Sequence, residues 1–367
     1  MNNLRVIIAG GGTGGHIFPA IAVGNALQRL RPGTQLLFVG AKGRMEMEKI
    51  PQEGFEIVGL DIVGFNRSSI LKNISLPIKL LKSRMEAKNI IKKFNPHVIV
   101  GVGGYASFPV LHAGQGMNIP TLIQEQNSFA GKSNKILARK AKAICVAYNN
   151  MGQFFPKDRV ILTGNPVRKK ISDMLRSSEE GRAFFGLTQD IKTVLIVGGS
   201  QGARSINEVI DARLEELMKA DVQVIWQTGR PYYEQARERA MPFSNRVKVL
   251  DFISDMDYAY AAADIVISRA GALAIAELCI AGKPVIFIPF PSAAEDHQTS
   301  NAMALVTHNA ALLVKDHEAK NELIKKLNLL LNDETMQEVM SQNLKAMAIK
   351  DADERIANKV IEIAGVS

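Results

Sequence analysis

Two glycine-rich segments carry the residue types that phosphate binding requires. The first reads Gly-Gly-Gly-Thr-Gly-Gly-His over residues 10–16, and the second reads Gly-Gly-Ser-Gln-Gly-Ala over residues 198–203. Each follows a short apolar run and precedes a segment of helical length. A strand, a glycine-rich turn and a helix together bring backbone N–H groups up to a phosphate. One such turn suggests a nucleotide site. Two, one near the start of each half, suggest two similar α/β domains facing each other across a cleft.

Two side chains near these turns could accept a proton. His16 directly follows the first turn, and the pKa of a histidine suits general base catalysis near neutral pH. Glu125 follows the apolar run at 121–124 and is a rival base, or a partner that raises the basicity of the histidine. His16 could instead orient a substrate or cap the helix. We favour His16 for the catalytic role and keep Glu125 as the second catalytic candidate.

The elements that must position these residues follow a regular alternation. Apolar runs of strand length are separated by helix-length segments throughout, which predicts parallel sheets with helices on both faces. The runs are apolar without interruption, as expected of strands buried on both faces. The predicted strands are 4–9, 35–39, 55–60, 98–102, 121–124, 143–146 and 160–162, then 193–197, 222–227, 247–250, 265–268, 285–289 and 311–314.

The predicted fold is therefore α/β, with two Rossmann-like, doubly wound parallel-sheet domains. A polar stretch within 164–190 separates the halves, so we place one domain at 1–165 and the other at 166–344. The helical pattern near the C-terminus, about 345–367, is expected to return to the first domain, because chain termini often lie close together. Ligands bind beyond the carboxyl ends of the strands in such sheets, and a cleft between the domains would collect the polar residues found there.

Composition and charge narrow the functional classes. The chain is 47% apolar and 22% charged, and no apolar run reaches the roughly 18 residues of a membrane span. Its start enters a strand without a charged-then-apolar leader, so we expect a cytoplasmic protein. The net charge of +9 favours an anionic partner: nucleic acid, an acidic membrane or a phosphorylated substrate. Aromatic residues make up only 6%, and no basic block alternates with them, so we expect no nucleic acid partner.

The two cysteines indicate neither a metal site nor a disulfide framework. Cys145 and Cys279 are far apart in the sequence, and each lies in an apolar run. We interpret both as small core residues.

Six motifs together resemble a known family. In chain order they are Gly-Gly-Thr-Gly-Gly-His (11–16), Gly-Gly-Tyr (103–105), Glu-Gln-Asn (125–127), Gly-Asn-Pro-Val-Arg (164–168), Gly-Gly-Ser-Gln-Gly-Ala (198–203) and Ser-Arg-Ala-Gly-Ala-Leu (268–273). Over essentially the whole chain, they resemble the MurG family of bacterial N-acetylglucosaminyltransferases, which convert lipid I to lipid II in peptidoglycan synthesis. The resemblance implies a GT-B glycosyltransferase that moves GlcNAc from UDP-GlcNAc, with inversion, to undecaprenyl-diphosphate-MurNAc-pentapeptide.

The resemblance also implies roles for residues of the donor site, held mainly by the second domain. Ser200 would contact the diphosphate with Arg168 nearby, Glu277 would accept the ribose hydroxyls, Ile253 would flank the uracil, and Gln298 would reach the sugar hydroxyls. The plainer interpretations are a ligand-free tight turn for Ser200 and solvated surface side chains for Arg168, Glu277 and Gln298. The full expected donor set is Thr13, Gly14, Gly15, Asn127, Arg168, Ser200, Ile253, Ala272, Leu273, Glu277 and Gln298.

The acceptor is expected to meet the first domain. There, Gly103 and Gly104 would let the backbone approach the acceptor diphosphate, and Tyr105 would help bind the acceptor. Asn127 would bind the transferred sugar.

Two Asp-x-Asp triplets, 255–257 and 351–353, could in another glycosyltransferase class hold a metal on the nucleotide. Here Ser254 and Asp257 fit a capping box before residues 258–263, and the second triplet begins the C-terminal helix. We therefore expect no obligatory protein-bound metal and no cofactor beyond the donor substrate.

The segment 74–94 has two apolar stripes at helical spacing. One should face the core. The other, flanked by lysines, suits an interfacial helix on an anionic membrane, although a helix buried on both sides is the alternative. We expect a peripheral protein on the cytoplasmic, inner-leaflet face of the membrane. The candidate membrane residues are Ile74, Ile78, Lys79, Leu81, Lys82 and Met85.

Competing interpretations remain from the sequence. One is another GT-B glycolipid glycosyltransferase or a UDP-sugar epimerase, and another is a basic nucleic-acid-binding protein. An NAD-dependent oxidoreductase fits poorly, because neither glycine-rich turn fits G-x-G-x-x-G followed by an acidic residue at the end of the second strand. The second predicted strand is followed by Gly40 instead.

Overall fold

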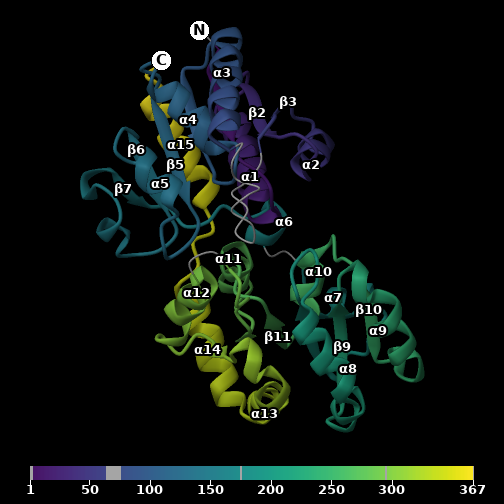
Figure 1. Cartoon of the computed structure of the whole chain (residues 1–367). Coiled ribbons are helices and arrows are strands. Elements are labelled where there is room, and N and C mark those ends of the chain that lie inside the picture. The colour runs from purple at the N-terminus through teal and green to yellow at the C-terminus, as the bar shows by residue number, and fades with distance from the viewer. Residues whose placement is uncertain (1–2, 63–75, 174–175, 294–295, 367) are drawn as a thin grey trace. The chain divides into compact units, whose positions relative to one another are not determined.

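The computed structural model describes residues 3–62, 76–173, 176–293 and 296–366, with 76–80 described by their backbone alone. The chain forms two compact units (Figure 1). The N-terminal unit comprises residues 1–168 and 351–367, and the C-terminal unit comprises residues 169–350.

The N-terminal unit is built on a parallel sheet of seven strands in the order β3-β2-β1-β4-β5-β6-β7. The order reverses beside β1, where β1 pairs with both β2 and β4, so the turns that follow β1 and β4 lie at one edge of the sheet. The strands are β1 (Arg5–Ala9), β2 (Gln35–Ala41), β3 (Ile57–Leu60), β4 (Val98–Gly101), β5 (Thr121–Glu125), β6 (Ala143–Val146) and β7 (Val160–Leu162).

Helices cover both faces of this sheet, because alternate strand residues enter two separate cores. Ile7 of β1 packs with residues of α3, α4 and α5, whereas Val6 and Ile8 pack with α1, α2 and α15. The helices of this unit are α1 (Gly14–Leu30), α2 (Glu46–Gln52), α3 (Leu76–Phe94), α4 (Ser107–Gln115), α5 (Lys132–Leu137) and α15 (Ala352–Ala364). Short 3-10 helices at Met151–Gln153 and Lys157–Arg159 precede β7.

The C-terminal unit has a parallel sheet of six strands in the order β10-β9-β8-β11-β12-β13. Its strands are β8 (Lys192–Val197), β9 (Val222–Gln227), β10 (Val247–Leu250), β11 (Ile265–Ser268), β12 (Val285–Phe287) and β13 (Leu312–Leu313). Its helices are α6 (Lys169–Ser172), α7 (Ser178–Phe184), α8 (Arg204–Lys219), α9 (Tyr233–Ala240), α10 (Met256–Ala262), α11 (Ala272–Ala281), α12 (His297–Val306), α13 (Ala319–Asn332) and α14 (Glu334–Ala346). The prediction of two doubly wound parallel-sheet domains is confirmed.

Every strand expected from the apolar runs is present, with bounds within two residues of the prediction. The early end of β12 has a local cause. β12 ends at Phe287 and not at Pro289, because proline has no N–H to donate and because Arg269 takes the carbonyl oxygens of Ile288 and Pro289. Cys145 and Cys279 are buried, as predicted, and burial raises the pKa of each thiol to about 12.

The structure defines the ends of the C-terminal helices and of α10. The helix expected at about 345–367 is α15, which begins at Ala352 and contributes Ile356 and Val360 to a core of the N-terminal unit. The preceding helix, α14, ends at Ala346 and packs on α11 in the C-terminal unit. At α10 the N-cap is Asp255, one residue after Ser254, and the capping box expected at Ser254 stays a prediction. Asp257 is buried and accepts a hydrogen bond from Arg176 at 3.4 Å.

The last helix is tied to the first by charge as well as by apolar contact. Arg29 of α1 donates to Asp353 of α15 at 2.9 Å, and its guanidinium also reaches Glu354 at 3.1 Å. The second Asp-x-Asp triplet thus supplies a buried anchor between helices distant in the sequence.

The stability of the N-terminal unit should depend on His97. Its Nδ1 accepts the N–H of Arg5 at 3.0 Å, so the native ring is held with that nitrogen unprotonated. Burial, Arg5 and Arg31 lower the pKa of His97 from 6.5. The unfolded chain therefore binds this proton more readily, and the free energy of unfolding should fall as the pH drops below about 6.5.

We expect His97→Asn, whose Oδ1 can still accept the Arg5 N–H, to flatten this pH dependence in part. Burial also lowers the pKa of His112, so part of the pH dependence of the unfolding free energy should remain in the variant. Urea unfolding at pH 5.5 and 7.5 checks the effect, with the exposed His317→Asn as the matched control. An unchanged pH dependence in His97→Asn would contradict the assignment.

Candidate active site

The second glycine-rich turn connects β8 to α8 and leaves the start of the helix open. Gly199 and Gly202 have φ of 86° and 75°, which favour glycine, and the N–H of Gly202 closes the turn on the Gly199 carbonyl at 2.8 Å. No side chain caps α8, and its first turn contains no acidic residue. The first N–H groups of a helix have no partner inside it, so this end can stabilise an anion.

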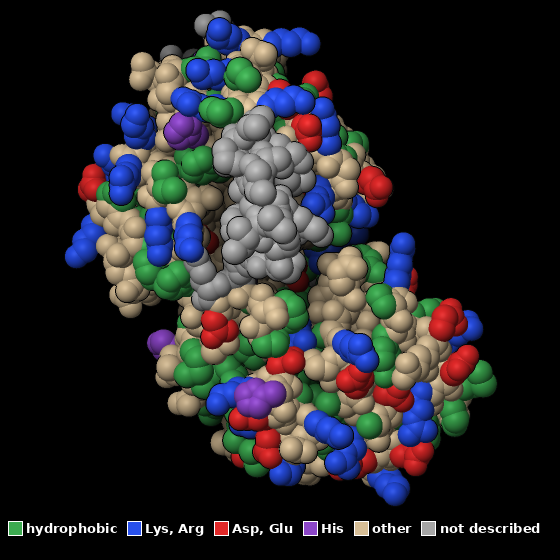
Figure 2. Space-filling model, viewed as in Figure 1, with side chains coloured by type: hydrophobic (Ala, Val, Ile, Leu, Met, Phe, Trp, Pro, Cys, Tyr) green, Lys and Arg blue, Asp and Glu red, His purple; other side chains and the backbone are tan. Residues whose placement is uncertain are grey.

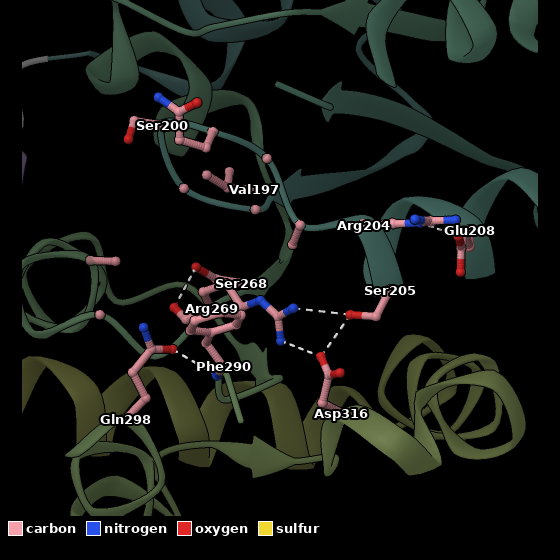
Figure 3. Close-up of a pocket in the computed structure, with 17 residues that line it drawn as sticks. Val197, Ser200, Arg204, Ser205, Glu208, Ser268, Arg269, Phe290, Gln298 and Asp316 are labelled. Carbon is pink, nitrogen blue, oxygen red and sulfur yellow. Dashed lines mark hydrogen bonds and ion pairs between the residues drawn. The ribbon is translucent and has the colours of Figure 1, made fainter. Parts of the chain in front are cut away.

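A cavity of about 710 Å³ opens beside this turn, a volume suited to a small ligand (Figure 3). It is lined by the turn, by the residues that follow β11, and by Phe290, Gln298 and Asp316. Of the expected donor residues, the structure places Ser200 and Gln298 in this cavity. The lining residues come from four separate stretches of the C-terminal unit.

Gln298 is oriented by a backbone contact. Its Oε1 accepts the N–H of Phe290 at 2.9 Å, and Figure 3 shows its amide nitrogen turned toward the cavity. The amide can therefore donate to a ligand hydroxyl without giving up its own anchor.

A charged network that we did not predict supports the floor of the cavity. Arg269 donates to Asp316 at 2.5 Å and to Ser205 at 2.9 Å, and Ser205 donates to Asp316 at 2.6 Å (Figure 3). These contacts join the end of β11 to the first turn of α8 and to residue 316, far along the chain. Because Asp316 neutralises Arg269, the guanidinium acts here as a brace. The only sequence signal for this network is that Arg269 belongs to the motif at 268–273.

Glu277 lies on α11 and is a buried carboxylate, 5% exposed, that accepts the hydroxyl hydrogen of Tyr260 at 3.0 Å. Ile253 is buried, whereas Ala272 and Leu273 are half-buried in the first turn of α11. The prediction that Glu277 is enclosed agrees with its burial, and its ligand contact stays a prediction.

In the N-terminal unit, the first glycine-rich turn places His16 in the first turn of α1. Thr13 Oγ1 lies 3.1 Å from Nδ1 of His16. The Cδ2 side of the ring lies against the turn that follows β4, since a Cβ on Gly103 would sit 2.6 Å from Cδ2 of His16. The ring is thus held between Thr13 and the backbone at Gly103.

Gly103 and Gly104 are needed for the contact between these two turns. A Cβ on Gly104 would lie 2.1 Å from the Gly11 carbonyl oxygen, and the N–H of Gly103 already donates to Ser107 Oγ at 3.0 Å. This packing explains both glycines without a ligand, so their acceptor role stays a prediction. Tyr105 is exposed beside them.

Glu125 is a fully engaged, buried carboxylate. It accepts hydrogen bonds from the backbone N–H groups of Asn127 and Gly131, and from the side-chain amides of Asn127 and Asn134, at 2.9–3.4 Å. Burial raises the pKa of Glu125, and these donors oppose that rise. All four donors come from the segment that follows β5, so the carboxylate holds that segment in place.

The remaining polar motif residues of this unit largely bind one another. Gln124 donates to Asn165 at 2.9 Å, and Asn165 donates to the Gln126 carbonyl at 3.0 Å. Arg168 stacks on Phe18, with its guanidinium carbon 5.1 Å from the ring centre. Its expected proximity to the donor diphosphate stays a prediction.

The candidate membrane helix presents an apolar face to solvent where it is described. Leu81 and Met85 are each 61% exposed, whereas Ala87 and Ile91 on the other face are buried. The alternative of a helix buried on both sides is therefore wrong for Leu81 and Met85. Lys82 is exposed and lies 3.6 Å from Asp61. Ile74 and the side chains of Ile78 and Lys79 lie outside the described residues.

Within the described ranges, no group of three His, Cys, Asp or Glu side chains is arranged to hold a metal ion. The expectation that no protein-bound metal is required stays a prediction.

Comparison with known proteins assigns both halves of the chain. Residues 6–146 match the glycosyltransferase family 28 N-terminal domain, and residues 193–356 match the family 28 C-terminal domain. The chain is 52% identical to a protein of Bacteroides thetaiotaomicron over 98% of both chains. It is 51% identical to a protein of Cytophaga hutchinsonii, covering 98% of this chain and 96% of that one.

Both relatives are named UDP-N-acetylglucosamine–N-acetylmuramyl-(pentapeptide) pyrophosphoryl-undecaprenol N-acetylglucosamine transferase. Among solved structures, the chain is similar to MurG of Acinetobacter baumannii, with a TM-score of 0.78 and 30% identity over 98% of this chain and 99% of that one.

The turn that borders the cavity should not tolerate a side chain at Gly202. A Cβ there would lie 1.8 Å from the Thr228 carbonyl oxygen, so the backbone itself must move. We expect Gly202→Ala to lower the free energy of unfolding of the C-terminal unit by about 2–5 kcal/mol, from overpacking and left-handed strain together.

Trp226, the single tryptophan, lies in this unit, so its fluorescence reports the unfolding of the unit. Gly186→Ala is the matched control in the same unit, because Gly186 also has positive φ but only the flexible end of Lys248, at 4.0 Å, near its Cβ position, and should cost only about 1–2 kcal/mol. Equal losses in the two variants would show that the steric contact at Gly202 is unimportant.

Proposed function

The chain belongs to glycosyltransferase family 28, and from this premise we propose that it transfers GlcNAc from UDP-GlcNAc to the 4-hydroxyl of MurNAc in undecaprenyl-diphosphate-MurNAc-pentapeptide, the step from lipid I to lipid II in peptidoglycan synthesis. The two relatives of about 50% identity carry the name of this activity over nearly their whole length. The observation in the molecule that supports it best is the cavity at the uncapped start of α8, which fits a ligand with a diphosphate.

In this proposal the C-terminal unit binds the donor. The diphosphate of UDP-GlcNAc lies against the turn at 198–203 with Ser200, and Gln298 donates to sugar hydroxyls. The buried Glu277 accepts the ribose hydroxyls, and Ile253, Ala272 and Leu273 enclose the uracil side. As the bond to the sugar breaks, negative charge grows on the diphosphate, and the N–H groups at the start of α8 stabilise it.

The transfer is a single displacement with inversion. The acceptor oxygen attacks the anomeric carbon, the bond from that carbon to the diphosphate oxygen breaks, and UDP leaves with the bonding electrons. His16 takes the proton of the attacking hydroxyl on Nε2. For that nitrogen to hold a free electron pair, Nδ1 must carry the hydrogen and donate it to Thr13 Oγ1, 3.1 Å away. Thr13 thus orients the base.

Glu125 is the weaker candidate for the base. Its two oxygens already accept four hydrogen bonds from residues of its own loop, so an attacking hydroxyl would have to displace one of them. We assign Glu125 to the support of Asn127, Asn127 to binding of the transferred sugar, and His16 to proton removal.

The acceptor and the membrane belong to the N-terminal unit. That unit contains 24 Lys and Arg against 12 Asp and Glu, a net charge of +12, whereas the C-terminal unit contains 21 against 24, a net charge of −3. Figure 2 shows Lys and Arg predominating over acidic side chains on the visible face of the N-terminal unit. A basic surface with exposed Leu81 and Met85 suits peripheral binding to an anionic inner leaflet. No described helix is long and apolar enough to cross a bilayer.

The activity is tested by incubating the protein with UDP-GlcNAc and a lipid I analogue and measuring released UDP. We expect release to require the acceptor. A UDP-sugar epimerase would convert UDP-GlcNAc without it, so acceptor-independent turnover would refute the proposed transfer. His16→Gln should lower kcat by about 10²–10⁴-fold, the usual contribution of a general base, while the Kd for UDP-GlcNAc stays the same. His317→Gln, an exposed histidine, is the control and should be fully active.

Membrane binding is tested by sedimentation with vesicles that contain anionic phospholipid. We expect Leu81→Ser with Met85→Ser to weaken sedimentation by about tenfold or more, because two exposed apolar side chains no longer enter the interface. The matched control is Ile136→Ser, which removes an apolar side chain of similar exposure (54%) elsewhere in the same unit. UDP-GlcNAc affinity should be unaffected in all three proteins. Equal binding of the double variant and the wild type would refute this membrane face.

A further inference from the structure

Glu46 is a completely buried carboxylate beneath the first glycine-rich turn. It is the first residue of α2 and is 0% exposed. Its Oε2 accepts the N–H of Gly12 at 2.8 Å, and its Oε1 accepts the N–H of Ala41 at 3.0 Å. Burying a carboxylate is costly unless hydrogen bonds satisfy it. Here backbone N–H groups at the end of β2 and ahead of α1 supply those bonds.

The backbone around Glu46 is shaped to admit it. A Cβ on Gly11 would lie 2.3 Å from its Oε1, and a Cβ on Gly40 would lie 2.5 Å from its Cγ. Glycine at these two positions therefore leaves the room that the glutamate side chain fills. The turn and the carboxylate form one packed unit.

The two glycine-rich turns consequently differ in what they can bind. Neither α1 nor α8 has a side-chain cap or an acidic residue in its first helical turn, but the turn before α8 opens into a cavity. The turn before α1 already contains an anion, because the Gly12 N–H is committed to Glu46. A substrate phosphate there would lose this donor and meet a like charge.

We propose that Glu46 is a positioning residue for the transfer step, its carboxylate standing in for a bound anion beneath the first turn. It holds Gly12, and through Gly12 it places Thr13 and His16. Thr13 in turn orients Nδ1 of His16, and the ring rests against Gly103. This inference rests on the proposed role of His16 as base. Displacing a catalytic group by about 1 Å can cost about 10²-fold in rate, so the support beneath the turn has a direct kinetic consequence.

The first test is Glu46→Gln, which keeps the shape but leaves one oxygen to accept two N–H groups. We expect kcat to fall about 10–100-fold while KM for UDP-GlcNAc stays within about twofold, since most of the proposed contacts to the nucleotide lie in the other unit. Glu48→Gln, an exposed carboxylate on the same helix, is the matched control and should behave as wild type. An unchanged kcat in Glu46→Gln, or an equal loss in kcat and donor affinity, would overturn the positioning role.

A second measurement is independent of activity and of whether the variant folds well. In the wild-type protein, amide hydrogen exchange at Gly12 should be slowed as strongly as in the neighbouring β1, although Gly12 lies in a turn. Exchange of Gly12 as fast as in the exposed turn at Gly43 would overturn the Glu46 contact. If the wild type failed to transfer GlcNAc, the proposed function would fall while this measurement still decided the contact.

Discussion

A buried carboxylate is costly unless hydrogen bonds satisfy it, and this constraint separates the two glycine-rich turns of the chain. Ahead of α1, the buried carboxylate of Glu46 accepts the N–H of Gly12, within the turn itself. At the turn before α8 the uncapped start of the helix faces a cavity. The same strand-turn-helix unit therefore serves once as a rigid support and once as a ligand site. Similar sequence patterns at the two turns conceal this difference.

Charges inside the molecule are paired so that they position backbone without competing for ligand. Arg269 lines the cavity beside α8, where a guanidinium without an ion-pair partner would be expected to bind a phosphate. Instead Asp316 neutralises it, and its donors tie β11, the segment after β12 and α8 together. Glu125 does the same for the segment after β5 in the other unit. Charge for the ligand then comes mainly from the helix start, which costs no reorganisation during the reaction.

The fold was predictable because its strands are uninterrupted apolar runs between glycine-rich turns, a local signal that each segment carries by itself. Ser200 could be placed at the cavity from the sequence because it belongs to such a turn, whereas Gln298, which also lines the cavity, was expected only from the family resemblance. Ser205, Asp316 and Glu46 carry no local signal, because each looks like an ordinary polar residue near a helix start. Each of the three makes at least one contact with a residue 34 to 111 positions away, which no local pattern reveals.

Buried polar support of this kind implies a division of labour among the motif residues. Gln124, Gln126 and Asn165 bind one another beneath the sheet edge, so these parts of the motifs specify loop geometry and not substrate contact. Replacing such groups with apolar residues of similar shape often stabilises a protein. Their retention around one sheet edge is therefore explained by the geometry that they impose. In the proposed mechanism the chemistry rests on few groups, His16 and the start of α8, and most of the surrounding polar residues hold the loops in place.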